Sequence, residues 1–345
     1  MSMLQLISEG NFLKATLNEE LSVEIGSFTL KSGVKINVLD RGIIEIVPRK
    51  ESVDALIVSS GIHGDETAPI EVVSELLNSI IQEKIIPSKN LLLIVAHPKA
   101  TNQHVREIDI NLNRLFSGKE QGQSIEHKIA ENLKSKVEYF FKKKTYVNKI
   151  HLDLHSAIRK SKYFGFGVSP SCTGNVRKPE FFAFLAQTKL GAITLSDIPS
   201  STFSWYTGEF YESQSITLEL GKVARFGEND HKLLQPTFDA ISELISIDGY
   251  KDIEFDESDI DIYKSTRTLF KKTNDFHFTF DAGVPNFTFF EKGIHLASDN
   301  GQEYYAAEGG EAVVFPNPNV QIGHRTCMLM QPTQIKIVNN QVMKS

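Results

Sequence analysis

The chain has 345 residues, of which 41% are hydrophobic and 23% are charged. This is ordinary for a globular protein, and the length suffices for one large domain and a smaller one. The formal net charge of −6 argues against nucleic acid or an anionic membrane as a partner. The first residues show no signal peptide, no apolar run approaches a membrane span, and two cysteines suggest no disulfide framework, so we expect a cytoplasmic protein.

Strands and helices are predicted to alternate over the first two thirds of the chain. Short β-branched runs predict strands over residues 34–38, 55–59, 91–96, 150–154 and 215–220, and amphipathic stretches predict helices over 69–83 and 124–142. This alternation is typical of an α/β sheet with helices on both faces. Because ligands of such sheets bind at the strand ends, polar residues that follow these strands are candidate functional residues.

The composition changes near residue 250, where an acidic polar stretch is followed by short aromatic-rich runs. Residues 276–280 and 286–290 alternate with a period close to two, and turn residues separate them. We therefore predict an α/β domain over residues 1–250 and a smaller β-rich domain over residues 251–345. A strand expected near residues 22–30 is a candidate partner for the second domain.

Two strand ends carry the residues of a candidate zinc site. The sequence Gly-Ile-His-Gly-Asp-Glu over residues 61–66 follows the first of these strands, and the strand over 150–154 ends in His155. His63 and Glu66, three positions apart, can both reach one metal ion, and His155 completes the set. Zinc that hydrolyses amides or esters commonly takes two histidines, one glutamate and a water molecule. We therefore predict a catalytic zinc site.

A hydrolase also needs a base and groups that bind the substrate. Glu219 lies in the apolar strand over 215–220, where burying a carboxylate without a purpose is costly. It is a candidate to take a proton from the attacking water and pass it to the leaving nitrogen, and a structural ion pair is the alternative. Arg106, Asn113 and Arg114 share one polar loop. They are candidates to polarise the scissile carbonyl and to grip a carboxylate, and a solvated surface loop is the alternative.

Several neighbouring residues have two interpretations. Asp153 shares a strand face with His155 and is predicted to orient that ligand, whereas His151 on the same face either does the same or packs in the core. Asp65 either caps the helix that begins near Glu66 or forms a hydrogen bond that tunes one of the candidate metal ligands. We favour the cap. Three tyrosines of the C-terminal region are candidates for the mouth of the site, namely Tyr263, Tyr304 and Tyr305.

Together these motifs resemble the succinylglutamate desuccinylase and aspartoacylase family, which is related to the zinc carboxypeptidases. The resemblance is carried by residues 61–66, by Arg106 with Asn113 and Arg114, and by residues 151–155 and 217–221. The sequences Asp-Leu-His-Ser-Ala-Ile-Arg over 153–159 and Val-Phe-Pro-Asn-Pro over 314–318 are similar to the desuccinylase branch. The resemblance implies a carboxypeptidase-like α/β fold, with a mixed sheet flanked by helices and a smaller β-rich C-terminal domain.

The resemblance also implies a role for each candidate residue. One zinc ion per chain is bound by His63, Glu66 and His155, Glu219 is the acid/base residue, Arg106 polarises the carbonyl, and Asn113 with Arg114 binds the α-carboxylate of the amino acid. The implied reaction is hydrolysis of N-succinyl-glutamate, a small anionic substrate, to succinate and glutamate. That reaction is the last step of arginine breakdown through succinylated intermediates.

One departure from the aspartoacylase branch concerns a further substrate carboxylate. Aspartoacylases typically place an arginine shortly before the catalytic glutamate, whereas this chain has no Lys or Arg between Lys189 and Lys222. Our hypothesis is that Arg159, just beyond His155, supplies the missing cation, and a surface ion pair is the alternative. Alternative functions are an aspartoacylase-type hydrolase of N-acyl amino acids, a carboxypeptidase, and a non-catalytic metal-binding protein of the same fold.

Overall fold

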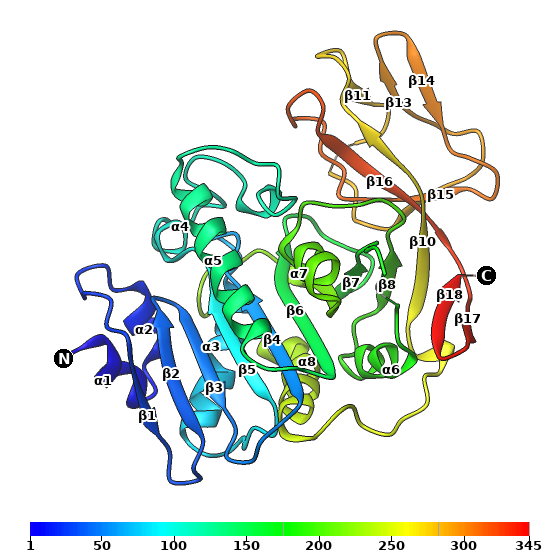
Figure 1. Ribbon diagram of the computed structural model, residues 1–345. Coiled ribbons are helices and arrows are strands. Elements are labelled where there is room, and N and C mark those ends of the chain that lie inside the picture. The colour runs from blue at the N-terminus through cyan, green and yellow to red at the C-terminus, as the bar shows by residue number, and fades with distance from the viewer. Residues whose placement is uncertain (175, 282, 345) are drawn as a thin grey trace.

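The fold is built on one mixed sheet that runs through the whole molecule (Figure 1). The computed structural model describes residues 1–174, 176–281 and 283–344. Within that part of the chain the sheet has 13 strands, in the order β1-β2-β3-β5-β4-β6-β9-β7-β8-β10-β16-β15-β12. The predicted α/β class is confirmed, with helices flanking a mixed sheet and a β-rich C-terminal region.

The centre of the sheet consists of parallel strands whose carboxyl ends meet at one edge. β4 pairs in parallel with β5 on one side and β6 on the other, and β6 pairs in parallel with β9. The β-branched runs predict all four strands correctly: β4 (Asp54–Ser60), β5 (Asn90–Val95), β6 (Asn148–Ala157) and β9 (Gln214–Lys222). On one side the sheet continues through β3 (Ile43–Val47), β2 (Lys35–Asp40) and β1 (Gly26–Thr29), and on the other through β7 (Gly165–Ser169) and β8 (Ala192–Leu195).

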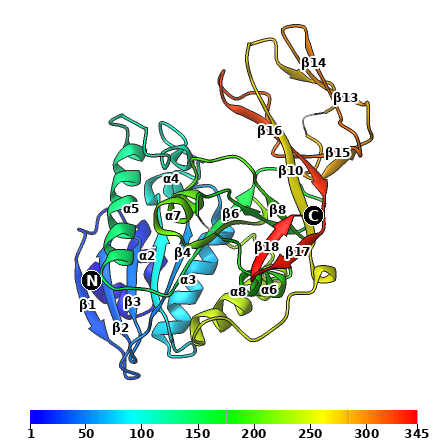
Figure 2. The ribbon, with the colours of Figure 1, turned by 45° about the vertical axis from the view of Figure 1, so that its right-hand side comes forward.

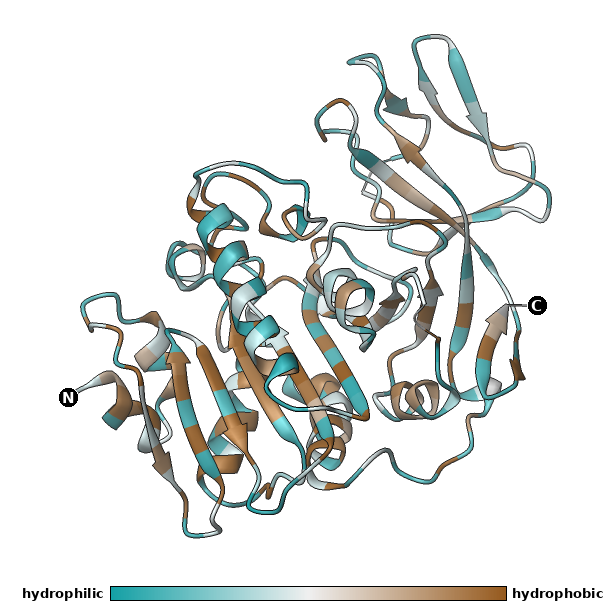
Figure 3. Cartoon of the chain, viewed as in Figure 1, coloured by the Kyte–Doolittle hydropathy of each residue, from teal (hydrophilic) through white to brown (hydrophobic). Residues whose placement is uncertain are grey.

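Helices cover both faces of these strands, because successive strand residues point to two different cores. Leu152 and Leu154 of β6 share a core with residues of α3 (Thr67–Ile81), α6 (Pro179–Gln187) and α8 (His231–Ser246). The opposite face is covered by α5 (Ile125–Lys142) and α7 (Phe203–Tyr211). Figure 3 shows the resulting alternation of polar and apolar residues along β6. The polar positions lie on the α7 side, where His151 contacts Thr207.

The other helical segments in the described residues are short. They are α1 (Met3–Ser8), α2 (Phe12–Leu17), α4 (Pro98–Gln103), η1 (Leu112–Arg114) and η2 (Glu257–Asp259). Over the described ranges of the chain, no helix combines the length and the apolar character that a membrane span requires.

The C-terminal β region continues the sheet and then projects from it (Figures 1 and 2). β10 (Asp261–Phe270) pairs in parallel with β8 and antiparallel with β16 (Arg325–Pro332). β15 (Glu311–Val314) and β12 (Thr288–Phe290) complete this edge. β11 (His277–Phe278), β13 (His295–Asp299) and β14 (Gln302–Tyr305) form a separate small sheet, and β17 (Ile335–Val338) pairs with β18 (Gln341–Lys344).

The N-terminal strand is not a partner of the C-terminal region. β1 pairs with β2 at the opposite end of the sheet from β12, so this part of the prediction is wrong. Phe28 and Leu30 pack against the core that also contains Met3 and Leu6 of α1. This segment is therefore held at the N-terminal end of the sheet, where its apolar side chains are partly buried.

Candidate active site

The candidate metal ligands come from two strand ends and one helix start. His63 lies in the turn after β4, Glu66 is the N-cap residue of α3, and His155 lies near the end of β6. Gly61 has a φ of 64°, which favours glycine, and it turns the chain out of β4. Gly64 has no room for a side chain, since a Cβ there would lie 2.2 Å from the backbone of α4. The two glycines of the motif therefore allow the tight turn that carries His63 and Glu66.

The two histidines present the same ring nitrogen to Glu66. His63 Nδ1 lies 2.7 Å from Glu66 Oε1, and His155 Nδ1 lies 2.9 Å from Glu66 Oε2. Each opposite nitrogen has an acceptor, Asn111 Oδ1 at 3.1 Å from His63 Nε2 and Asp153 Oδ2 at 3.2 Å from His155 Nε2. These acceptors favour a proton on each Nε2. Both Nδ1 atoms then face one point beside Glu66, where a bound cation would replace the proton that each shares with the carboxylate. Burial lowers the pKa of His155, but Asp153 and Glu66 outweigh it and hold the pKa well above its ordinary value, so metal binding there would release a proton.

This donor set fits a metal ion. One ligand atom from each of His63, Glu66 and His155 lies within 4.8 Å of the others, and all three residues are buried. Zinc bonds of about 2.0–2.2 Å to nitrogen and oxygen separate tetrahedral ligand atoms by about 3.3 Å, so small side-chain movements suffice. Burial, reinforced by the charge of Arg106, lowers the pKa of His63 to about 4. The ring is therefore neutral at physiological pH, as a ligand must be.

Glu66 is oriented by two donors. Arg106 Nη1 donates to Oε1 at 2.7 Å, and the backbone N–H of Ser156 donates to Oε2 at 3.0 Å. Burial raises the pKa of Glu66, but His63 and His155 outweigh it and hold the pKa well below its ordinary value. Glu66 is therefore an ionised carboxylate, and Arg106 lies beside it with its side chain 29% exposed.

Glu219 lies directly beside the candidate ligands. β6 and β9 are parallel neighbours, and their register pairs Glu219 with His155. The Glu219 side chain is buried and accepts no hydrogen bond from the described residues. Burial raises the pKa of Glu219 to about 7, against the opposing effect of His155. A carboxylate with a pKa near neutrality is suited to accepting a proton and returning it.

A buried polar network supports His155 on the side away from Glu66. Asp153 accepts from His155 and, at 2.6 Å, from Ser59 Oγ. Ser59 Oγ also lies 2.7 Å from His151 Nε2, and His151 Nδ1 lies 2.8 Å from Thr207 Oγ1. Asp153 therefore orients His155, as its position on the strand predicts. His151 contacts that carboxylate only through Ser59.

The polar loop after α4 is anchored by a buried carboxylate. Glu126 of α5 accepts from the backbone N–H groups of Ile108 and Asp109 at 2.8 and 3.0 Å. The same oxygen lies 3.2 Å from His97 Nε2. These bonds fix the loop between Arg106 and η1, which carries the candidate substrate-binding side chains.

Asn113 extends from η1 to the candidate ligands. Its Oδ1 accepts from the backbone N–H of Phe203 at 2.9 Å, and its Nδ2 lies 3.4 Å from His155 Nε2. Because that nitrogen of His155 already carries a proton directed at Asp153, it cannot also accept from the amide. The N–H groups of Asn113 are therefore available to a ligand.

Arg114 is one of three arginines near the site. It is open to solvent, and its Nη1 donates to the Asn113 carbonyl at 2.9 Å. Although the residue is exposed, the protein atoms around its guanidinium desolvate it and lower the pKa of Arg114, and the positive charges of Arg325 and Arg106 act in the same direction. Arg325, at the start of β16, is predicted by no sequence pattern and comes from the C-terminal region.

Arg159 lies two residues beyond β6 and is partly buried. Within the described ranges it forms no hydrogen bond or ion pair, so the surface ion pair weighed against its substrate role is not observed there. Tyr263 is a core residue whose hydroxyl lies 2.8 Å from that of Tyr163. Tyr304 and Tyr305 lie on β14, in the small projecting sheet.

Asp65 does not cap α3. Glu66 is the N-cap residue, and Asp65 Oδ1 is buried without a hydrogen-bond partner among the described residues. The cap interpretation is therefore wrong. The reason is geometric, because the turn through Gly61 and Gly64 brings the chain to the helix start one residue later than the sequence suggests.

Three residues that support the site are missed by the sequence analysis: Asn111, Ser59 and Glu126. Asn111 and Ser59 lie inside segments singled out for other residues. Strand alternation places Ser59 on the same sheet face as Asp153, its register partner on β6. Glu126 has only the signal of an acidic residue in a first helical turn, which a favourable interaction with the helix dipole already explains.

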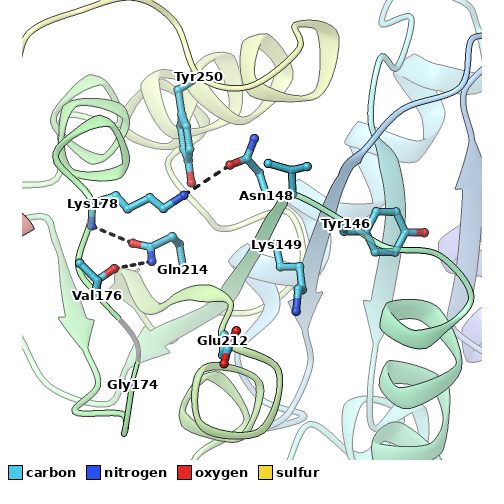
Figure 4. A pocket seen from close by; sticks show the side chains of 10 residues that line it. Tyr146, Asn148, Lys149, Gly174, Val176, Lys178, Glu212, Gln214 and Tyr250 are labelled. Carbon is cyan, nitrogen blue, oxygen red and sulfur yellow. Dashed lines mark hydrogen bonds between the residues drawn. The ribbon is translucent and has the colours of Figure 1, made fainter. Parts of the chain in front are cut away.

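A pocket of about 290 Å³ is separate from the candidate ligands. It lies at the amino ends of β6 and β9, where Asn148 and Gln214 begin those strands (Figure 4). Gln214 binds the backbone of Val176 and Lys178 there. His155 and Glu219 lie toward the other ends of the same strands, so this pocket does not belong to the site.

Comparisons with known proteins assign both parts of the chain to known domain families. The family model described as Succinylglutamate desuccinylase/Aspartoacylase catalytic domain matches residues 52–245. The AstE/AspA barrel-sandwich hybrid domain matches residues 258–333. The chain is 38% identical over 334 residues to the succinylglutamate desuccinylase of Vibrio vulnificus (strain YJ016), which covers 96% of this chain and 97% of that protein.

Solved structures are similar over nearly the whole chain. The succinylglutamate desuccinylase of Vibrio parahaemolyticus superposes with a TM-score of 0.91 at 36% identity, covering 97% of this chain and 98% of that one. The enzyme of the same name from Chromobacterium violaceum gives a TM-score of 0.80 at 29% identity, covering 94% and 98%. The chain therefore belongs to the succinylglutamate desuccinylase/aspartoacylase family.

Proposed function

We propose that this protein is a zinc-dependent amidohydrolase that cleaves N-succinyl-L-glutamate to succinate and L-glutamate. One observation carries the proposal: the Nδ1 atoms of His63 and His155 converge on the Glu66 carboxylate, with Glu219 in register beside His155. The choice of substrate is supported by the names of the similar proteins from the two Vibrio species and from Chromobacterium violaceum. A cytoplasmic role in arginine breakdown is part of the same proposal.

In this proposal His63, Glu66 and His155 hold one zinc ion per chain. When bound, zinc would act as a Lewis acid and lower the pKa of water. Asn111 and Asp153 contribute by holding the Nε2 protons of the two histidines, so that both Nδ1 atoms stay directed at the same point.

Glu219 is proposed as the acid/base residue. In its ionised form it removes one proton from the attacking water, whose oxygen forms the new bond to the succinyl carbonyl carbon. Glu219 then returns the proton to the glutamate nitrogen as the C–N bond breaks. A pKa near 7 permits both transfers near neutral pH. Arg106 is proposed to stabilise the negative charge that develops on the carbonyl oxygen.

Asn113 and Arg114 are proposed to bind the α-carboxylate of the leaving glutamate, through amide and guanidinium donors. Arg159 stays a candidate for a further substrate carboxylate. The lack of Lys and Arg between Lys189 and Lys222 favours the desuccinylase branch over the aspartoacylase branch.

The test compares two substrates on protein of known zinc content. Release of amino acid is followed with N-succinyl-glutamate and with N-acetyl-aspartate at equal concentrations. We expect about one zinc per chain and strong preference for N-succinyl-glutamate. Glu219→Gln is expected to keep zinc and to lower kcat by about 10²- to 10⁴-fold, because the proton acceptor is lost.

Glu138→Gln is the matched control, since Glu138 lies on the surface and pairs only with Lys142 in the described residues. Preference for N-acetyl-aspartate would keep the zinc hydrolase and overturn the substrate. Turnover of peptides alone would favour a carboxypeptidase. Bound zinc with no turnover of any of these would favour a non-catalytic protein.

A further inference from the structure

Arg325 is a cation of the C-terminal region whose side chain rests on an aromatic surface. It is the first residue of β16 and pairs with Phe270 at the end of β10. Its guanidinium lies 5.6 Å from the centre of the Phe315 ring. The Phe315 ring in turn lies 5.5 Å from the ring of Phe166. Stacking on an aromatic face holds a guanidinium in place without neutralising its charge.

This aromatic surface connects Arg325 with the candidate active site. Phe166 on β7 is the register partner of Glu219 on β9. The charge of Glu219 acts on Arg325, and the charge of Arg325 acts on Arg114. Arg325 is therefore within electrostatic reach of Glu219, the proposed base, and of Arg114, which is proposed to bind the α-carboxylate.

Arg325 lacks a carboxylate partner within the described residues. The acceptor it contacts there is the sulfur of Met328, 3.1 Å from Nη1, and a thioether is a weak acceptor. Arg267, in the same region, shows the ordinary arrangement, because it forms an ion pair with Glu311 at 2.7 Å. A partly buried guanidinium whose charge also acts on Arg114 is costly without an anion, and an anionic ligand would remove that cost.

We propose that Arg325 binds a second carboxylate of the substrate and thereby selects N-acyl amino acids that carry one. This inference rests on the proposed function. N-succinyl-glutamate offers two carboxylates besides the α-carboxylate, one on the glutamate side chain and one at the end of the succinyl group. Both have the planar shape that a guanidinium grips with two parallel hydrogen bonds. The C-terminal region thus supplies the cation that the segment before Glu219 does not contain.

The test measures kcat/KM of Arg325→Gln with three substrates. They are N-succinyl-glutamate, N-succinyl-glutamine, which lacks the side-chain carboxylate, and N-butyryl-glutamate, which lacks the succinyl carboxylate. For N-succinyl-glutamate we expect a loss of about 10- to 100-fold relative to the wild type, the usual effect of removing one charge-assisted contact. The loss should disappear for the one substrate that lacks the carboxylate bound by Arg325.

A loss that disappears with N-succinyl-glutamine assigns Arg325 to the glutamate side chain. A loss that disappears with N-butyryl-glutamate assigns it to the succinyl group. Equal losses with all three substrates, or no loss with any, would overturn the inference. If instead the wild type does not cleave N-succinyl-glutamate, the proposed function itself fails, so the two failures are distinguishable.

A binding measurement removes the dependence on turnover. In a Glu219→Gln background, calorimetric titration with N-succinyl-glutamate should show weaker binding when Arg325→Gln is added. Arg325→Lys should recover part of the affinity, because the charge is kept and the paired geometry is lost. Lys292→Gln is the matched control, since Lys292 is an exposed cation of the same region that pairs with Glu308. Arg159→Gln tests the competing residue, and a carboxylate-dependent loss there but not in Arg325→Gln would overturn the inference.

Discussion

The helix-flanked part of the sheet and the C-terminal β region use buried polar groups in different ways. In the C-terminal region, Asp299 accepts from the backbone N–H groups of Lys272 and Thr273, at 2.6 and 3.1 Å, and is satisfied locally. In the helix-flanked part, buried side chains from separate strands meet around His155 and Glu66. The first arrangement stabilises a turn, whereas the second brings two ring nitrogens and a carboxylate to one point.

The difference shows where function can be sought in such a fold. A buried carboxylate whose hydrogen-bond capacity is filled by nearby donors needs no ligand. Glu311, which pairs with the Arg267 side chain, is a further example. At the carboxyl ends of β4 and β6, by contrast, His63, Glu66 and His155 bring ligand atoms within 4.8 Å of one another. Arg325 is the exception in the C-terminal region, since it extends toward the helix-flanked part without a carboxylate partner in the described residues.

Removing one of the candidate ligands is expected to have the largest effect on metal binding. We expect His155→Ala to lower the affinity for zinc by more than about 100-fold, because even residues that only orient a ligand commonly contribute 10- to 100-fold. Activity should be lost with the metal. Zinc content after dialysis and circular dichroism measure the two effects separately. His231→Ala is the matched control, since His231 is exposed on α8. Full zinc occupancy in His155→Ala would refute the ligand assignment.

Exchanging one buried aspartate in each region separates a role in metal binding from a role in stability. Asp153→Asn should lower zinc affinity by about 10- to 100-fold, because the charge that orients His155 is lost. Asp299→Asn removes a charge from an equally buried carboxylate and should leave zinc affinity unchanged. Competition with a chelator measures both. Equal affinities for the two variants would mean that Asp153 contributes only to the fold.

The sequence predicts that His63, Glu66 and His155 meet at one sheet edge because their positions follow from strand geometry. A run of β-branched residues that ends in a polar side chain places that side chain at the sheet edge, and His63 and His155 both follow this pattern. The alternation of β6 also places Asp153 on the face of His155. The local periodicity of the sequence is therefore enough to predict where these residues lie in the sheet.

Features that depend on long-range packing escape the same reasoning. β1 cannot pair with the C-terminal region because the two lie at opposite ends of the sheet, and no local pattern reveals that separation. Arg325 lies close enough for its charge to act on Arg114 only because β10 extends the sheet beyond β8. Asp65 is displaced from the cap position by a turn whose tightness depends on contact between Gly64 and α4.

The smallest predicted effect concerns the anchor of the substrate-binding loop. Burial raises the pKa of Glu126, but hydrogen bonds from Asp109, Ile108 and His97 outweigh it and lower the pKa to about 2. The ordinary value is 4.5. Because the folded pKa lies below the unfolded one, the stabilisation is complete above about pH 4.5 and is lost as the pH falls toward 2.

Glu126→Gln should therefore lower the free energy of unfolding by about 1–2 kcal/mol at pH 7, and by much less near pH 3. Urea unfolding at the two pH values measures the difference. Zinc affinity should not change, because Glu126 contacts none of the candidate ligands among the described residues, whereas KM should rise as the loop that carries Arg114 loosens. Asp299→Asn is the counterpart in the C-terminal region, and it should lower stability with the same sign of pH dependence while leaving KM unchanged. A KM that rises equally in both variants would show that the loop responds to general loss of stability and not to its own anchor.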